Sequence, residues 1–453
     1  MNRSRRTFLT AGVLAAGALT GAALGSTLPF GSAPEAAQAA ASEVHPLFPA
    51  HAPLGEGQGV HPGRVVWTHR PQAVSWDGTG FWWQPEHFAE DVILEMVRSG
   101  IAALAGTATA AEGWAALFAW HNAKSGRTGG RKPGEKIAIK CNMNGAAAYD
   151  DDRDGRTHES FTSPVLLKCL LTSLVEDAGV APSDITAYDA GRIFPDFMMA
   201  MCREGILSGV NFRHRDPGGE LDAVPDEGEA LSWSGEVRGA VCRLPRCVTE
   251  ARYLINLASL KGHCYGMTLC GKNHFGSILN TSRMRAPQAA GLHGPVSSGR
   301  MGVRAVLTDL MAHRHLGGKT MLCLLDGLIT APGESVNITR RNAVWREAPF
   351  NGAFCASLFF SQDMVAIDSV GADFLTSEPV MLANNSELSS NRGMENYLHE
   401  AALAHNPPSG APYGTGDGPV RKSLGVHEHW NNARDKLYSR NLGRSEGIEL
   451  VRA

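Results

Sequence analysis

The chain has 453 residues, 43% of them hydrophobic, which is enough for one large domain, or two in close contact, with a sizeable core. The formal net charge is −3, from 42 Lys and Arg against 45 Asp and Glu, so overall charge argues against a nucleic-acid-binding protein. None of the nine cysteines belongs to a C-x-x-C pair, which argues against a ferredoxin-type iron–sulfur cluster and a zinc ribbon.

The N-terminus has the features of an export signal. Residues 4–9, SRRTFL, match the twin-arginine (Tat) pattern, a weakly apolar stretch follows, and Ala37-Gln38-Ala39 offers a small-residue cleavage site. A membrane anchor is the alternative, which the glycine content and Pro29 disfavour. We therefore predict export by the twin-arginine translocase to the periplasm or the extracellular space. Cleavage of residues 1–39 removes three Arg and one Glu, so the net charge changes from −3 to −5.

Strand and helix patterns alternate along the rest of the chain, after a linker at residues 40–63. Apolar runs predict strands at residues 64–69, 136–141, 185–189, 237–243, 253–257, 320–325 and 356–361. Periodic apolar residues predict helices at residues 86–99, 111–122, 164–178, 195–204, 302–313 and 364–376. This alternation predicts an α/β fold with a mixed or mainly parallel sheet flanked by helices. We assign the α/β domain to residues 64–378, and residues 379–453 to an irregular C-terminal extension packed on the same domain.

Polar residues gather where several of these strands end. Because the carboxyl ends of parallel strands share one edge of a sheet, we expect a ligand-binding cleft there. The expected ligand-binding residues are Lys140, Asn142, Lys261, Asn273 and Asp326, with Asp189 beside them. Asp189 and Asp326 suit the capping of turns and helices equally well, and this alternative stays open.

The segment at residues 256–276, NLASLKGHCYGMTLCGKNHFG, contains the best candidates for catalysis, His263 and Lys272. An imidazole titrates near neutral pH and transfers protons or binds metal, and a lysine holds an anion or forms a covalent adduct. His274 in the same segment is a candidate metal ligand.

The spacing within this segment is distinctive. It reads Asn256-x-x-x-Leu260-Lys261-x-His263, then Gly266-x-Thr268, then Gly271-Lys272-Asn273-x-Phe275-Gly276. Lys140-x-Asn142, Asp326-Gly327 and Asp363-x-Val365-Ala366-Ile367-Asp368 accompany it in order. Together these motifs resemble the signature of the domain of unknown function 362 (DUF362) family, over roughly residues 64 to 378. The resemblance implies an α/β fold and leaves the activity open.

The arrangement of His263 and Lys272 is also loosely similar to the site segment of nickel-dependent lactate racemase. There a histidine transfers a proton and a lysine tethers the nickel-pincer cofactor. That similarity implies these two roles here, with a metal-containing cofactor. The racemase's other histidine motif has no partner in this sequence.

Two further patterns suggest metal ions. Asp150-x-Asp152-x-Asp154-Gly155 has the alternate carboxylates and the glycine of a calcium loop, but Phe161 occupies the twelfth position, where such loops have glutamate. An exposed acidic loop is the alternative. Near the C-terminus, His427-x-His429 places two imidazoles on one side of a strand, where either metal ligation or packing on the domain fits.

These observations predict an enzyme of redox or isomerase type that binds a small anionic ligand or a metal-containing cofactor. The alternative is a non-catalytic periplasmic protein that binds a ligand or a metal, and a structural calcium protein is a third hypothesis. The sequence has no G-x-S-x-G nucleophile elbow, P-loop or convincing dinucleotide G-x-G-x-x-G, which disfavours serine hydrolases, NTPases and nicotinamide dehydrogenases.

Overall fold

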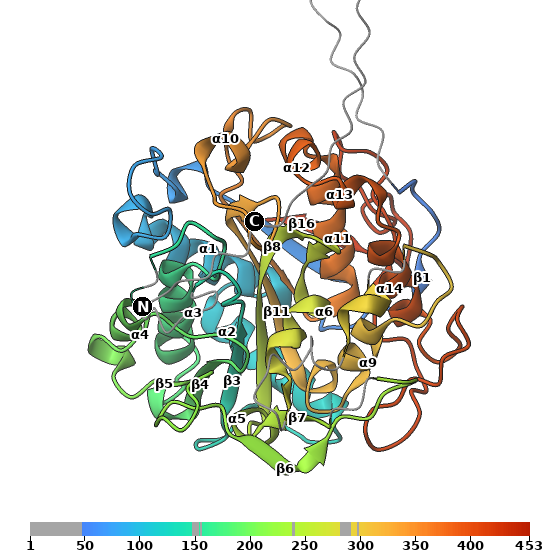
Figure 1. Ribbon diagram of the computed structural model, residues 1–453, viewed down its shortest axis with the longest axis horizontal. Coiled ribbons are helices and arrows are strands. Elements are labelled where there is room, and N and C mark those ends of the chain that lie inside the picture. The colour runs from blue at the N-terminus through green and yellow to red at the C-terminus, as the bar shows by residue number, and fades with distance from the viewer. Residues whose placement is uncertain (1–47, 147–153, 155, 238–240, 281–290, 297–298) are drawn as a thin grey trace, which may run out of the picture. The chain divides into compact units, whose positions relative to one another are not determined.

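One mixed sheet of nine strands runs through the domain (Figure 1). The computed structural model describes residues 48–453 except 147–153, 155, 238–240, 281–290 and 297–298. The strands lie in the order β16 (Glu449–Arg452), β2 (Arg64–His69), β14 (Ser357–Ser361), β11 (Thr320–Ala331), β8 (Tyr253–His263), β3 (Ile137–Cys141), β4 (Ile185–Asp189) and β5 (Asn211–His214). A short ninth strand, β9 (Gly266–Thr268), pairs with the end of β8.

Most strands of this sheet point the same way. The neighbours β11, β8, β3, β4 and β5 are parallel, whereas β14 is antiparallel to both β11 and β2. The expected α/β fold with a mixed, mainly parallel sheet is therefore confirmed. Because the strands are in register, with Lys140 opposite Tyr188 and Asn256, the carboxyl ends of β3, β4 and β8 meet at one edge.

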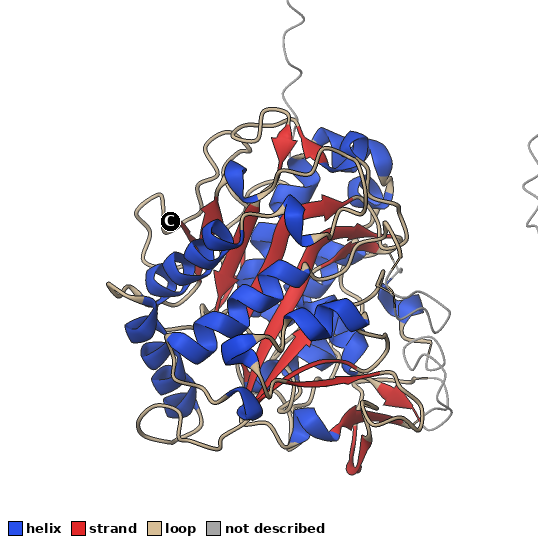
Figure 2. Ribbon diagram, turned by 90° about the vertical axis from the view of Figure 1, so that its left-hand side faces the viewer, coloured by secondary structure: helices blue, strands red, loops and turns tan. Residues whose placement is uncertain are grey.

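Helices cover both faces of the sheet (Figure 2). Alternate side chains of β14 separate two apolar cores: Leu358 and Phe360 join one, and Phe359 joins the other. The first core includes side chains of α1 (Glu90–Ala105), α2 (Ala110–Lys124) and α3 (Pro164–Glu176). The second includes side chains of α9 (Val306–Ala312), α11 (Met364–Ser377) and α14 (Gly393–Ala402). Burial on both faces explains why the central strands are almost continuous apolar runs.

The remaining described helices and strands are short. The helices are α4 (Asp196–Met201), α5 (Arg246–Thr249), α6 (Cys270–Asn273), α8 (His293–Val296), α10 (Arg340–Ala343), α12 (Pro379–Asn384) and α13 (Glu387–Ser390). The strands are β1 (Leu54–Gly55), paired with β15 (Val426–His427); β6 (Pro225–Ala230), β7 (Cys242–Pro245) and β10 (Leu279–Asn280), which form a small sheet; and β12 (Val344–Trp345), paired with β13 (Ala353–Phe354).

Two central strands are longer than their apolar runs predict. β8 continues to His263 and β11 continues to Ala331, because the two strands stay paired beyond their apolar runs: Asp326 lies opposite Ser259 and, after a register shift, Ala331 lies opposite Lys261. Lys261 and His263 therefore lie on a strand and not in a loop. This extension moves the true strand ends several residues along the chain.

Residues 379–453 contain more regular structure than their periodicity suggests. They include α12, α13, α14 and β15, and their last strand, β16, pairs in parallel with β2. The C-terminal segment thus supplies an edge strand of the sheet.

No single helix in the described part of the chain is long and apolar enough to cross a membrane. The pair α1 and α2, bent by 49° at their junction, satisfies the length and composition criteria together. These two helices pack on each other, and α1 also packs on β2 and β14.

Candidate functional site

A cavity of about 380 Å³ lies at the carboxyl ends of β3, β4 and β8. This is the sheet edge where polar strand-end residues predicted a cleft. The charged and histidine side chains on the cavity wall are Lys140, Asp189, Arg192, His263, Lys272, His293 and Glu334. Three cations against two carboxylates make the wall suitable for an anion.

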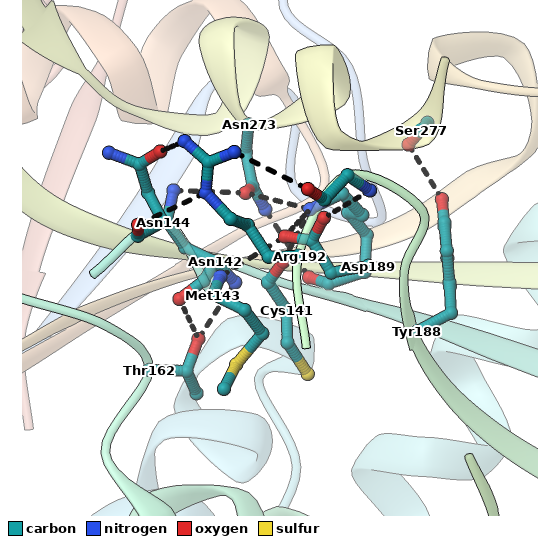
Figure 3. A network of polar contacts seen from close by, with 12 residues as sticks. Cys141, Asn142, Met143, Asn144, Thr162, Tyr188, Asp189, Arg192, Asn273 and Ser277 are labelled. Atoms are coloured by element: carbon teal, nitrogen blue, oxygen red, sulfur yellow. Dashed lines mark hydrogen bonds and ion pairs between the residues drawn. The ribbon is translucent and has the colours of Figure 1, made fainter. Parts of the chain in front are cut away.

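A buried ion pair forms one part of the wall. Lys140 Nζ donates hydrogen bonds to Asp189 Oδ2 at 3.1 Å and to Asn273 Oδ1 at 3.3 Å. The Asp189 carboxylate also accepts the backbone N–H groups of Met143 at 3.1 Å and Gly191 at 2.9 Å. Figure 3 shows Asp189 within this network. Because both charges are fully partnered, the pair is a fixed element of the wall.

Asn273 connects α6 to two strands of the sheet (Figure 3). Its Oδ1 accepts hydrogen bonds from Lys140 and from Asn142 Nδ2, the latter at 3.2 Å. Its Nδ2 donates to Asn256 Oδ1 at 2.8 Å and to the Leu257 carbonyl at 3.2 Å. An asparagine suits this position because its amide both donates and accepts hydrogen bonds. The network holds α6 against β3 and β8.

Asp368 of α11 anchors the other end of α6. Its carboxylate accepts the backbone N–H groups of Cys270 at 2.8 Å and Gly271 at 2.9 Å, which are at the start of α6, and the Tyr397 hydroxyl at 3.1 Å. Burial raises the pKa of Asp368 to about 7. In the same motif, Asp363 caps α11. Both carboxylates of the motif therefore position helices.

Lys272 on α6 lines the cavity, and none of the described carboxylates is its partner. Its Nζ lies 3.5 Å from His293 Nε2 and 4.0 Å from the centroid of the Phe275 ring. Within the described part of the chain, no acidic side chain forms an ion pair with this ammonium group. Burial lowers the pKa of Lys272 from 10.5 to about 7, and the charge of Glu334 opposes this only in part. Both the amine and the ammonium form therefore exist near neutral pH.

His263, the last residue of β8, faces the same cavity. Its Nδ1 accepts the backbone N–H of Tyr265 at 3.1 Å, so the proton of the neutral ring is on Nε2, which lies 3.8 Å from Glu334 Oε1. Burial, followed by the positive charge of Lys272, lowers the pKa of His263 well below 6.5. Near pH 7 this side chain is a neutral donor.

Arg192 follows β4 and contacts the segment that follows β3. Its Nη2 donates to Asn144 Oδ1 at 2.6 Å and its Nε donates to the Asn144 carbonyl at 3.1 Å (Figure 3). The guanidinium group is thereby oriented at the cavity wall.

Gly276 leaves room for the ion pair beside it. A Cβ atom at this position would lie 2.6 Å from Lys140 Nζ and 2.7 Å from Asp189 Oδ1. Only glycine therefore permits this close approach of the backbone.

Two buried polar atoms on the wall lack hydrogen-bond partners among the described residues. These are Asn142 Oδ1 and Thr268 Oγ1. Buried polar groups in folded proteins are nearly always satisfied by protein, water or ligand. Because both atoms lie on the cavity wall, we expect a ligand or solvent molecule to form their hydrogen bonds.

Comparison with known families assigns this region. The profile described as Domain of unknown function (DUF362) matches residues 137–373, slightly more than half of the chain. The chain belongs to the DUF362 family. No curated protein matches it. The matched range includes every residue that lines the cavity of the DUF362 protein, from Lys140 to Ser335.

Two of the predicted ligand-binding residues do not line the DUF362 cavity. Lys261 is buried and donates from Nζ to the Ser160 carbonyl at 3.0 Å, and burial lowers its pKa to about 8. Asp326 accepts the backbone N–H groups of Ser163 at 2.7 Å and Leu328 at 3.2 Å. The capping alternative is therefore correct for Asp326, because β11 continues beyond it and its carboxylate holds the start of α3.

The predicted metal ligands are also placed away from the cavity or outside the described residues. His274 is buried, with Nε2 3.2 Å from Asn256 Nδ2 and Nδ1 3.4 Å from Ser277 Oγ, so packing occupies both ring nitrogens. Asp150 and Asp152 lie outside the described residues. Asp154 is exposed and pairs with Arg156 at 3.5 Å, and the calcium loop stays a prediction.

Three of the charged and histidine residues on the wall of the DUF362 cavity were not predicted: Arg192, His293 and Glu334. Arg192 follows β4 by three residues, so the strand-end argument applied fully would have included it. Glu334 was missed because β11 was expected to end at residue 325. His293 follows no predicted strand, and its residue type was the only signal in the sequence that could have identified it.

Among the described residues, two groups of side chains have metal-ligand spacing. One is His263, Cys264 and Glu334 at the cavity. In this group His263 Nδ1 already accepts a hydrogen bond, and burial, with the charge of Glu334, raises the pKa of the Cys264 thiol to about 12. A thiolate is therefore disfavoured there. The other group, away from the cavity, is His51, Glu395, His399 and His427.

Proposed function

We propose that this DUF362 protein is an exported enzyme that binds a small carboxylate in the strand-end cavity and transfers a proton to and from it, as isomerases do. The observation that carries the proposal is the position of Lys272. A buried ammonium group with no ion-pair partner among the described residues is a ready anion site.

The cavity wall supplies complementary charge. Lys272 is buried over the Phe275 ring, Arg192 is oriented by Asn144, and the Lys140–Asp189 pair is internally neutral. A carboxylate beside Lys272 and Arg192 is stabilised by charge-assisted hydrogen bonds in a site of low dielectric constant. Asn142 Oδ1 and Thr268 Oγ1, for which the described residues supply no hydrogen-bond partner, offer further hydrogen bonds to ligand hydroxyl or amino groups.

The same residues suit proton transfer. In its neutral form, the Lys272 amine accepts a proton from a carbon atom next to the substrate's carboxylate: the C–H bond breaks, an N–H bond forms, and the electron pair remains on the substrate as an enolate. The cationic wall stabilises this added negative charge. His263 donates its Nε2–H as a hydrogen bond to the enolate oxygen and keeps its proton, and the Lys272 ammonium formed in the first step returns the proton to the carbon atom. A pKa of Lys272 near the working pH is the optimum for such a general base.

Export is the second part of the proposal and is supported by the twin-arginine pattern at Arg5 and Arg6. The test is fractionation of cells that produce the full chain or its Arg5→Lys/Arg6→Lys variant. We expect the wild-type chain, shortened by about 39 residues, outside the cytoplasm. The variant should accumulate inside at full length. Equal export of both chains would contradict this part.

The catalytic part is tested by incubating the purified protein in D₂O with small carboxylates that have an acidic α-C–H bond. Deuterium incorporation into the carboxylate, followed by NMR, reports C–H bond breakage. We expect exchange with the wild-type protein, at least a hundredfold slower exchange with Lys272→Met, and no effect of Lys422→Met at an exposed lysine.

Binding without exchange would support the alternative, a non-catalytic periplasmic ligand-binding protein. Measurement of the intact mass tests whether Lys272 holds a covalently bound cofactor. A mass excess that disappears in Lys272→Met would identify a covalently held cofactor in place of the free amine. Failure of every carboxylate to bind would overturn the proposal.

A further inference from the structure

Four potential metal ligands from three distant segments meet away from the cavity. His51 precedes β1, Glu395 and His399 lie on α14, and His427 lies on β15. β1 and β15 are paired, with Leu54 opposite His427, which brings the first of these segments to the last. All four residues lie outside residues 137–373, the range that matches the DUF362 family.

The distances between the ligand atoms have the scale of one metal site. Glu395 Oε1 lies 2.8 Å from His399 Nε2, 3.1 Å from His427 Nε2 and 3.9 Å from His51 Nε2. His51 Nε2 lies 3.3 Å from His427 Nε2, and all four ligand atoms lie within 4.8 Å of one another. Ligands bound tetrahedrally to zinc at about 2.0–2.1 Å are about 3.3 Å apart.

The outer hydrogen bonds determine which ring nitrogen points inward without a proton. The Ser369 hydroxyl donates its only proton to the Val365 carbonyl, so it accepts from His427 Nδ1 at 2.8 Å. His51 Nδ1 lies 2.7 Å from the Ala52 carbonyl, which can only accept. In the neutral rings of His51 and His427, Nε2 therefore carries a lone pair.

Two such lone pairs 3.3 Å apart repel each other unless a cation lies between them. An orienting bond at the outer nitrogen is also the usual arrangement for metal-binding histidines.

The carboxylate is oriented in the same way. Glu395 Oε2 accepts a hydrogen bond from His429 Nε2 at 2.9 Å, and His429 Nδ1 is held by Asp373 at 2.6 Å. This leaves Oε1 for the other three histidines. His429 of the His427-x-His429 motif thus supports the cluster from outside, while His427 points into it.

We infer that His51, Glu395, His399 and His427 bind one divalent transition-metal ion, with Zn²⁺ as the best match. Three imidazoles and one carboxylate suit zinc, whereas calcium and magnesium prefer sites made only of oxygen ligands. The His427 side chain is fully buried and that of Glu395 is 6% exposed, but those of His51 and His399 are 27% and 24% exposed. The metal therefore has a path from solvent, and it ties the segment before β1 to α14 and β15.

The test uses the exported chain after treatment with a chelator and dialysis. Zn²⁺ is titrated in competition with a chromophoric chelator, and Co²⁺ is added separately because its visible absorption reports four-coordinate geometry. We expect one equivalent of Zn²⁺ for the wild-type protein. Binding should be at least a hundredfold weaker in His51→Ala and in His399→Ala, which change partly exposed residues on different segments.

Matched controls distinguish this site from others. His405→Ala removes an exposed histidine just beyond α14, and Cys264→Ala alters the metal-spaced group at the cavity; both should bind Zn²⁺ like the wild-type protein. Near-UV circular dichroism checks the fold of each variant, and Zn²⁺ should raise the melting temperature of the wild-type chain but not of His399→Ala. No stoichiometric binding by the wild type, unchanged affinity in His399→Ala, or a loss confined to Cys264→Ala would each overturn the inference.

Discussion

Replacement of Lys272 by methionine should stabilise the protein, and the gain should depend on pH. Lys272 is buried on the cavity wall, and burial lowers its pKa from 10.5 to about 7. The unfolded chain therefore binds one more proton than the folded chain between these two values. Stability is reduced most below pH 7, and this loss disappears as the pH rises to about 10.5.

The pKa difference sets the size of the effect. At about 1.36 kcal/mol for each pKa unit, lowering the pKa from 10.5 to about 7 corresponds to about 5 kcal/mol of lost stability at pH 6. Methionine keeps most of the apolar side chain and its contact with Phe275 without the charge. Because the protein relaxes around a buried charge, we expect Lys272→Met to raise the free energy of unfolding by about 1–4 kcal/mol at pH 6.

The assay is urea unfolding of the wild-type protein and the variant at pH 6, 8 and 10, followed by circular dichroism. The difference between the two proteins should be largest at pH 6 and should shrink steadily toward pH 10. Taking this difference cancels the other titrating groups. Lys422→Met, at an exposed lysine, should show no difference at any pH. A destabilised Lys272→Met, or a gain that does not change with pH, would refute the reasoning.

Three further predictions follow from individual contacts. Asp326→Asn should lower the free energy of unfolding by about 1–3 kcal/mol, because an amide N–H₂ replaces an acceptor of the Ser163 or Leu328 N–H; urea unfolding measures this, and carboxylate affinity should stay unchanged. Gly276→Ala should weaken carboxylate binding at least tenfold, measured by calorimetry, since its Cβ displaces the Lys140–Asp189 pair. Glu334→Gln should lower the pKa of Lys272 further by removing a negative charge, which NMR of ¹³C-labelled lysine detects.

Loss of carboxylate binding in Asp326→Asn would place that residue in the site after all. Gly130→Ala, where a Cβ meets open space, is the control for Gly276→Ala, and equal affinities in the two variants would show that the close approach is unimportant. A higher pKa of Lys272 in Glu334→Gln would mean that Glu334 does not act on it through its charge.

The cavity lies where the predicted strand ends meet, but its wall differs from the predicted set at particular residues. Lys140, Asn142, His263, Lys272 and Asn273 all lie on the wall, as their positions in the sequence predicted. Asn273 differs in role, because its amide is saturated by contacts to the sheet and acts as a support. Residue type and strand position predict which side chains lie near the cavity. The hydrogen-bond partners of each side chain decide whether it is free to bind a ligand.

The sequence by itself determined the α/β class, the position of six of the nine strands of the main sheet, and the family, because apolar periodicity and motif spacing are local properties of the chain. Only the tertiary structure decided where β8 and β11 end, since a polar residue continues a strand when a neighbour pairs with it. Because β11 extends beyond its apolar run, Asp326 does not line the cavity and Glu334 does. The histidine cluster depends still more on the fold, because β1 and β15 must pair before His51 meets His427.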